Sequence, residues 1–405
     1  MGTPALHRPR PSTPPGFAAT LALSMGAGPL ALYALTATAP LVTADLDISR
    51  AQLGALPTAA FVTAALASPL LGRSADLFHG RTVLTALFTG AGLSLFGVAT
   101  APSYGWLFAA VALCGATQAM SNPVTNRLVA AHVPQGRRGR LMGVKQSGVQ
   151  MSQFAAGLAL PGLALVWGWR GAAASAAVVA ATGLALVRGS VPAGRPEPVA
   201  ARERRIADLP AAVWWLTGYA LTTGAALQAT NVYLPLYGFE RLELSPPVAG
   251  LTAAVAGGVG LVARIAWGRA ADLVRRPYGL LLALAVVSGF AACCLLAAEA
   301  LHAVWLLWAG AALFGASGIA ANVVIMLALM RAAPPHAVGI ASGILAVGLY
   351  LGFAAGPLGF GLIVDHTGSY RTAWLAVIGA NALAAALGAA RLPRGRSRPA
   401  AVPEP

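Results

Sequence analysis

Twelve apolar segments, separated by short polar connections, limit what this chain can fold into. One helix needs about 20 apolar residues to cross the hydrocarbon core of a bilayer, and each segment has roughly that length. Only 10% of the residues are charged, against about 25% in soluble proteins. We therefore predict an all-α membrane protein with twelve transmembrane helices, at residues 17–42, 52–71, 82–100, 103–131, 140–165, 169–190, 209–237, 246–268, 278–298, 301–331, 337–364 and 371–391.

The basic residues gather at alternate connections, near Arg73 and Arg81 and at 137–140, 188–205, 269–276 and 391–398. This is the positive-inside pattern. It predicts a multi-pass protein of the bacterial inner membrane with both termini cytoplasmic, and we expect a monomer in the lipid bilayer. The net charge of +15 does not indicate a nucleic-acid partner, because the arginines are divided among separate loops instead of forming one patch.

The two halves of the chain repeat one another. Gly72-Arg-Ser-Ala-Asp76-Leu returns as Gly268-Arg-Ala-Ala-Asp272-Leu, 196 residues later. Asn122 corresponds to Asn322 at an offset of 200. A spacing kept over several helices indicates a duplicated unit. We expect two pseudo-symmetric six-helix halves, and we place the cytoplasmic N-terminal tail, N-terminal half, cytoplasmic linker, C-terminal half and C-terminal tail at 1–16, 17–190, 191–208, 209–391 and 392–405.

This architecture and the segment from Gly72 to Arg81 resemble the major facilitator superfamily. Gly72, Ala75, Asp76 and Arg81 match the family's Gly-x-x-Ala-Asp-x-x-Gly-Arg-Arg/Lys loop in place, although His79 stands where the second glycine is expected and glycine has moved to the ninth position. The resemblance implies a cytoplasmic gate formed by this loop and its repeat. The alternative is that the loop charges serve topology alone. The expected gating residues are Gly72, Asp76, Arg81, Arg127, Arg264, Gly268 and Asp272.

The same resemblance implies a substrate site between the halves, near the middle of the membrane. Polar side chains recur at helical spacing in several apolar segments, and we take these as candidates for that site. They could instead form hydrogen bonds between helices, worth about 0.6 kcal/mol each. The candidates are Tyr33, Gln118, Asn122, Lys145, Gln146, Gln150, Gln228, Asn231, Asn322 and Tyr350.

Lys145 is the only lysine among 27 basic residues, and it lies inside an apolar segment, where a cation is costly. Its counterpart in the second half is Leu345. The side chain could snorkel to the cytoplasmic headgroups, or it could line the transport path. All twelve acidic residues lie at segment ends, in loops or in tails. A buried cation without a fixed acid favours a small anion as the substrate.

The sequence contains no catalytic or cofactor pattern. The one lysine lacks the glycine spacing of a P-loop, and the histidines show no metal-ligand spacing. We therefore expect neither an enzyme nor a bound cofactor or metal, and transport must use a gradient or exchange. A coupled proton could be carried by histidine, by Lys145 or by the substrate itself.

The segments Asn122–Arg127 and Pro134–Gly148 resemble the cyanate-permease-like branch of bacterial carriers, which implies uptake of a small anion. Proton-coupled drug exporters of the same fold often carry an Arg four residues before a glycine of the fourth helix. That glycine corresponds to Gly115 here, and the Arg position is occupied by Val111. Their proline motif also appears here in reversed order, at Pro161-Gly162. The leading hypothesis is a secondary carrier for a small anion. A drug or metabolite exporter is the alternative, and a transporter-like sensor is a third.

Overall fold

The computed structural model describes residues 14–192, 209–274, 277–334 and 338–391, and these residues contain helices and no strand. The predicted linker and tails lie almost wholly outside the described residues. The first half (the N half) holds α1 (Phe17–Ala27), α2 (Leu30–Ala37), α3 (Ala39–Leu46), α4 (Arg50–Leu77), α5 (Gly80–Ala99), α6 (Tyr104–His132) and α7 (Gln135–Ser190). The second (the C half) holds α8 (Ala211–Leu242), α9 (Pro246–Leu273), α10 (Tyr278–Ala300), α11 (Val304–Phe314), the π-helix η2 (Gly315–Ile319), α12 (Ala321–Ala332), α13 (Val338–Thr367) and α14 (Tyr370–Ala390).

The described helices accommodate the twelve predicted spans. Nine stretches are long and apolar enough to cross a membrane, and α1 and α2 form a tenth that is bent by 55°. Helix α7 provides two spans, because Gly168 has a φ of 68° and breaks the helical path. Helix α8 has 32 residues, ample for a crossing, although its Thr, Gln and Asn side chains make it less apolar. The fold class predicted from the sequence is thus confirmed.

Close glycine contacts recur at equivalent places in the two halves. A Cβ atom at Gly115 would collide with the carbonyl oxygen of Ala60, and one at Gly315 would collide with that of Ala256. Both residue pairs join the second and fourth spans of their own half. Small residues allow helix backbones to approach closely where lipid gives no hydrophobic drive for association. The repeated sequence therefore produces repeated packing.

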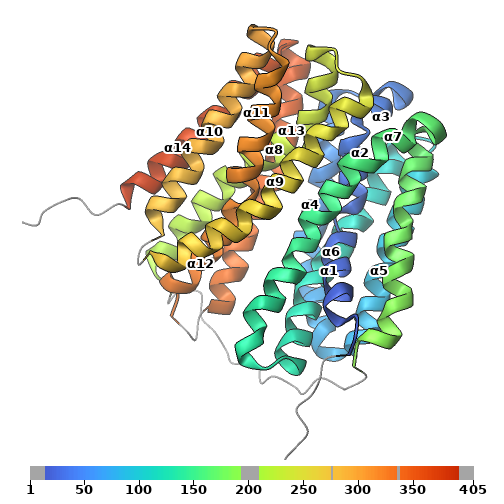
Figure 1. Ribbon diagram of the computed structural model, residues 1–405, viewed down its shortest axis with the longest axis vertical. Coiled ribbons are helices and arrows are strands. Elements are labelled where there is room, and N and C mark those ends of the chain that lie inside the picture. Colours follow the sequence, from blue (N-terminus) through green and yellow to red (C-terminus); the bar gives the residue numbers. More distant parts are fainter. Residues whose placement is uncertain (1–13, 193–208, 275–276, 335–337, 392–405) are drawn as a thin grey trace, which may run out of the picture.

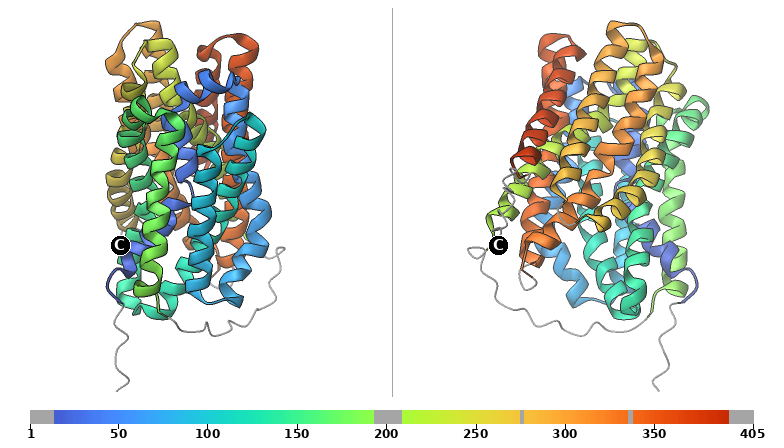
Figure 2. Two further views of the ribbon diagram at one scale, coloured as in Figure 1. Left: turned by 90° about the vertical axis from the view of Figure 1, so that its right-hand side faces the viewer. Right: turned by 60° about the vertical axis from the view of Figure 1, so that its left-hand side comes forward.

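The two halves lie side by side, with their long helices running along the long axis of the molecule (Figures 1 and 2). We call the end that holds the connections α3–α4, α8–α9 and α13–α14 the latch end. The opposite end, where α1 begins and α14 ends, is the terminus end. The hydrophobic core is shared by both halves toward the latch end. Toward the terminus end it divides into two separate clusters, one within each half.

Candidate functional site

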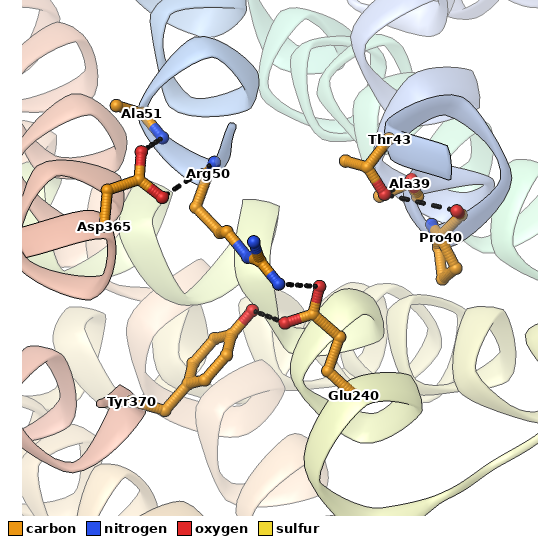
Figure 3. A network of polar contacts seen from close by, with 8 residues as sticks. All are labelled: Ala39, Pro40, Thr43, Arg50, Ala51, Glu240, Asp365 and Tyr370. Atoms are coloured by element: carbon orange, nitrogen blue, oxygen red, sulfur yellow. Dashed lines mark hydrogen bonds and ion pairs between the residues drawn. The ribbon is translucent and has the colours of Figure 1, made fainter. Parts of the chain in front are cut away.

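A polar network joins the halves at the latch end (Figure 3). The Asp365 carboxylate of α13 accepts hydrogen bonds from the backbone amides of Arg50 and Ala51, at 3.1 and 2.8 Å. These amides begin α4, where N–H groups lack helical partners and a negative charge is favourable. The Arg50 guanidinium pairs with Glu240 at 2.9 Å, and Tyr370 donates to the same carboxylate at 2.8 Å. We call Arg50, Glu240, Asp365 and Tyr370 the latch.

Further contacts between the halves lie near the middle of the bundle. Thr58 donates to the carbonyl oxygen of Ala354 at 2.6 Å, and Gln153 donates to Asn231 at 2.7 Å. The ring of Tyr350 stacks on that of Phe61 with centroids 6.0 Å apart. Two of the predicted substrate residues, Asn231 and Tyr350, thus lie at the seam between the halves.

At the terminus end, Arg138 and Arg331 each bond within their own half. Arg138 donates to the carbonyl oxygens of Ala130 and Val133. Arg331 does the same with Ala271 and Val274. The hydrogen bonds identified between the halves fall at the latch end and in the middle. The structure is therefore closed at the latch end.

The first span is interrupted in the middle of the N half. The carbonyl oxygens of Ser24, Gly26 and Gly28 lie at this break between α1 and α2. Side chains of α6 and α7 bond to all three: Ser121 donates to Ser24 at 3.2 Å, Ser152 to Gly26 at 2.9 Å and Cys114 to Gly28 at 2.8 Å. A helix can break at membrane depth only where neighbouring groups satisfy its backbone in this way.

Lys145 is 0% exposed, and its ammonium group points at α6. It donates to Thr125 Oγ1 at 2.8 Å, to Asn122 Oδ1 at 3.3 Å and to Asn126 Oδ1. The side chain therefore neither snorkels to the headgroups nor lies open between the halves in this conformation. Because an ammonium can only donate, the two amide oxygens must face it, and their NH₂ groups point away. The counterpart Leu345 is a buried apolar residue.

Arg264 of α9 lies near the seam between the halves, away from the latch end. Its Nε donates to the carbonyl oxygen of Ile319 at 3.3 Å. Ile319 lies midway along the span Val304–Ala332, so the guanidinium reaches the middle of the membrane. It also interacts electrostatically with Tyr33 of the N half. A guanidinium has five N–H donors, and this is its single hydrogen bond within the described part of the chain.

The remaining substrate candidates divide into buried and exposed groups. Gln150 is 3% exposed, and its Oε1 has no hydrogen-bond partner among the described residues. The same holds for Nε2 of Gln118, which packs beside Gly28. Gln228 is buried in α8, Asn322 is partly buried in α12, and Gln146 is exposed on α7.

The gating candidates cannot all be followed. The backbones of Gly72, Asp76 and Asp272 belong to α4 and α9, but the two Asp side chains and the surroundings of Gly72 lie outside the described part of the chain. Arg81 donates to the carbonyl oxygen of Val191, which closes the N half on itself. Gly268 lies in α9 beside Val323, Arg127 has an interaction partner, and Arg264 lies at the seam as described above.

The latch was not recognised from the sequence. Arg50, Glu240 and Asp365 lie at segment ends, where charges are also expected from membrane topology alone. Opposite charges on connections that face the same side of the membrane could have suggested a pairing, but not which residues meet. Other charges at this end bond within their own half. Arg170 donates a hydrogen bond to Asp45 at 2.6 Å, which lowers the pKa of that carboxyl.

The family model of the Major Facilitator Superfamily matches residues 21–357 and 240–404. The chain belongs to this superfamily. It is a membrane transporter by family, as the loop motif and the repeat predicted. No branch within the superfamily is distinguished, so the cyanate-permease-like resemblance stays a hypothesis. A search of curated proteins found no significant match.

Solved transporters share this fold. A bacterial homologue of the human lysosomal transporter Spinster, in an inward-facing and occupied conformation, aligns with a TM-score of 0.72 and 18% identity, covering 92% of this chain and 95% of that one. A mutant of the nucleoside transporter NupG aligns with a TM-score of 0.75 and 13% identity, covering 92% and 99%. At these identities the likeness concerns the fold alone.

Proposed function

We propose that this transporter carries a small anion across the bacterial inner membrane by alternating access. The observation that carries the proposal is Arg264, a cation at mid-membrane depth beside the seam between the halves, with most of its donors unused by the described residues. The six acidic side chains that the structure describes all lie at the latch end. Arg264 is partly exposed, but a guanidinium at mid-membrane depth is costly without a counter-charge, and a substrate anion would supply one.

Arg264 replaces Lys145 as the proposed counter-ion, because Lys145 is engaged by three oxygens of α6. Lys145 acts indirectly in this proposal. By binding the amide oxygens of Asn122 and Asn126, it turns their NH₂ groups outward, where they can donate to an anion. Asn126 is exposed, so one such donor is accessible. Lys145 is thus a positioning residue.

The terminus end is assigned to the cytoplasm on the basis of the positive-inside pattern. The closed latch then faces the periplasm, and the conformation is inward-facing. No carboxylate lies at mid-membrane depth among the described residues, so a coupled proton would be carried by the anion itself.

The test is a screen of purified protein against small inorganic and organic anions by thermal shift, followed by uptake of the hits into proteoliposomes. A ligand of the folded state raises the melting temperature by mass action. Anions that stabilise the protein and enter the vesicles saturably support the proposal. Stabilisation and efflux only with lipophilic cations would contradict it and favour the exporter. Binding without flux would favour a sensor.

Replacing Lys145 with methionine is expected to leave the free energy of unfolding within about 1 kcal/mol of the wild-type value. The variant loses three hydrogen bonds but no longer has to bury a charge, and these two effects offset one another. Uptake of the anion should fall about tenfold, the equivalent of one weakened charged contact of about 1.4 kcal/mol. Melting curves and uptake rates measure the two effects. The matched control is Leu345→Met at the equivalent position of the C half. This variant should keep the wild-type stability and the wild-type uptake rate. Unchanged uptake in Lys145→Met would refute the positioning role.

A further inference from the structure

An apolar groove of about 360 Å³ opens between the halves. The N half contributes Phe154 and Leu158 of α7. The C half contributes Trp308 of α11 and, from α9, Leu251, Ala254, Val255, Gly258 and Val259. Gly258 has no side chain to fill the groove. A Cβ atom at this position would lie 3.0 Å from the Phe154 ring. The lining is almost wholly apolar, so the groove cannot hold a charged solute.

The depth of the groove determines what can reach it. Phe154 and Leu158 precede the α7 break at Gly168 by 14 and 10 residues, about 21 and 15 Å along a helix. Leu251 and Val259 follow the start of α9 at Pro246 by 5 and 13 residues, about 8 and 20 Å. In a hydrocarbon core about 30 Å thick, the groove lies within the leaflet next to the latch end and extends toward the midplane. Hydrocarbon surrounds it.

The groove depends on contact between the halves. Its wall forms where α7 packs on α9: a Cβ at Gly157 would lie only 2.5 Å from the amide nitrogen of Ala254. Leu158 is 55% exposed at the rim, so the groove is open to the lipid side. Gln153, the residue before Phe154 in α7, donates a hydrogen bond to Asn231 across the seam. An occupant would therefore contact both halves next to a hydrogen bond that joins them.

We propose that this groove binds one acyl chain of a membrane phospholipid, held between the two halves. The depth, the apolar lining and the lateral opening fit a hydrocarbon chain. Trp308, four residues after the start of α11 at Val304, lies toward the latch-end surface, where a headgroup would sit and where indole rings are favoured. This site is separate from the anion site and does not depend on it.

The test reconstitutes the full protein in phosphatidylethanolamine vesicles that contain a phosphatidylethanolamine with a diazirine on one acyl chain. After photolysis, mass spectrometry locates the adducts. We expect adducts at 154–158 and 251–259 to exceed, by at least fivefold, those at apolar positions outside the groove that are at least as exposed, such as Val262 and Ile265. Labelling spread evenly over the exposed apolar residues would show ordinary surrounding lipid and overturn the proposal.

Two matched variants sharpen the result. Leu158→Trp fills the groove from its rim and should lower the labelling of 251–259 at least threefold. Leu165→Trp places the same indole on the same helix at a leucine that is 62% exposed and outside the groove, and it should leave that labelling unchanged. Equal labelling in both variants would also contradict the site. The wild-type map decides the question even if a variant fails to fold.

Discussion

Replacing Arg264 with glutamine is expected to abolish saturable anion uptake. Glutamine keeps a donor but removes the charge that the proposed substrate would neutralise. Loss of one partner of a desolvated, hydrogen-bonded charge pair costs about 2–5 kcal/mol. At about 1.4 kcal/mol per tenfold change, the ratio of maximal rate to KM should fall about 30- to 4,000-fold. Initial uptake rates in proteoliposomes, over a range of anion concentrations, measure the effect.

Two further variants control this experiment. Arg269→Gln removes an exposed arginine from the same helix and should retain uptake. Arg264→Lys keeps the charge but not the planar fork of donors, so it should show intermediate uptake. Retained uptake in a folded Arg264→Gln protein, or equal losses in Arg264→Gln and Arg269→Gln, would contradict a substrate-binding role for Arg264.

The fold followed from the sequence because both of its determinants are local or repetitive. A transmembrane span is recognisable in the sequence as about 20 apolar residues, and the duplication is visible in Gly72–Asp76 and Gly268–Asp272. Gly115 and Gly315 then make equivalent contacts in the two halves. Helix breaks were harder to foresee. The bend between α1 and α2 depends on Ser121, Ser152 and Cys114, which come from two distant helices.

The candidate site could be predicted from the sequence only in part. Helical spacing shows which face of a helix carries a residue, but not which other helix packs against that face. Lys145 was singled out correctly as a buried cation, yet its three partners on α6 depend on how α6 and α7 pack. Arg264 was assigned to the gate from its position near Gly268. Its long side chain reaches Ile319, in the middle of another span, which its sequence position does not reveal.

The latch lay beyond sequence reasoning for a related reason. Arg50 is 190 residues from Glu240 and 315 from Asp365, and the charges at helix ends are also explained by topology alone. Arg241 and Glu299 occupy similar helix ends and pair within the C half. Only the arrangement of the halves shows which charged pairs join them and which do not.

This distinction leads to the second large effect: Asp365→Asn should shift the population toward a conformation open at the latch end. The carboxylate holds the first amides of α4 across the seam, and a hydrogen bond to a charged group contributes about 1.5–3 kcal/mol. The ratio of closed to open molecules should therefore fall about 10- to 150-fold. Spin labels on Ala44→Cys and Arg371→Cys, with the exposed Cys293 replaced by serine, would report longer distances between the halves.

The control for the latch is Glu299→Gln, which breaks an ion pair at the same end of the molecule but within one half. The spin-label distances should not change in that variant, because both partners move together with the C half. If the two substitutions lengthened the distances equally, general loosening of the latch end would explain the result. If neither did, the shared core toward the latch end would suffice to hold the halves closed, and the polar network would not be a latch.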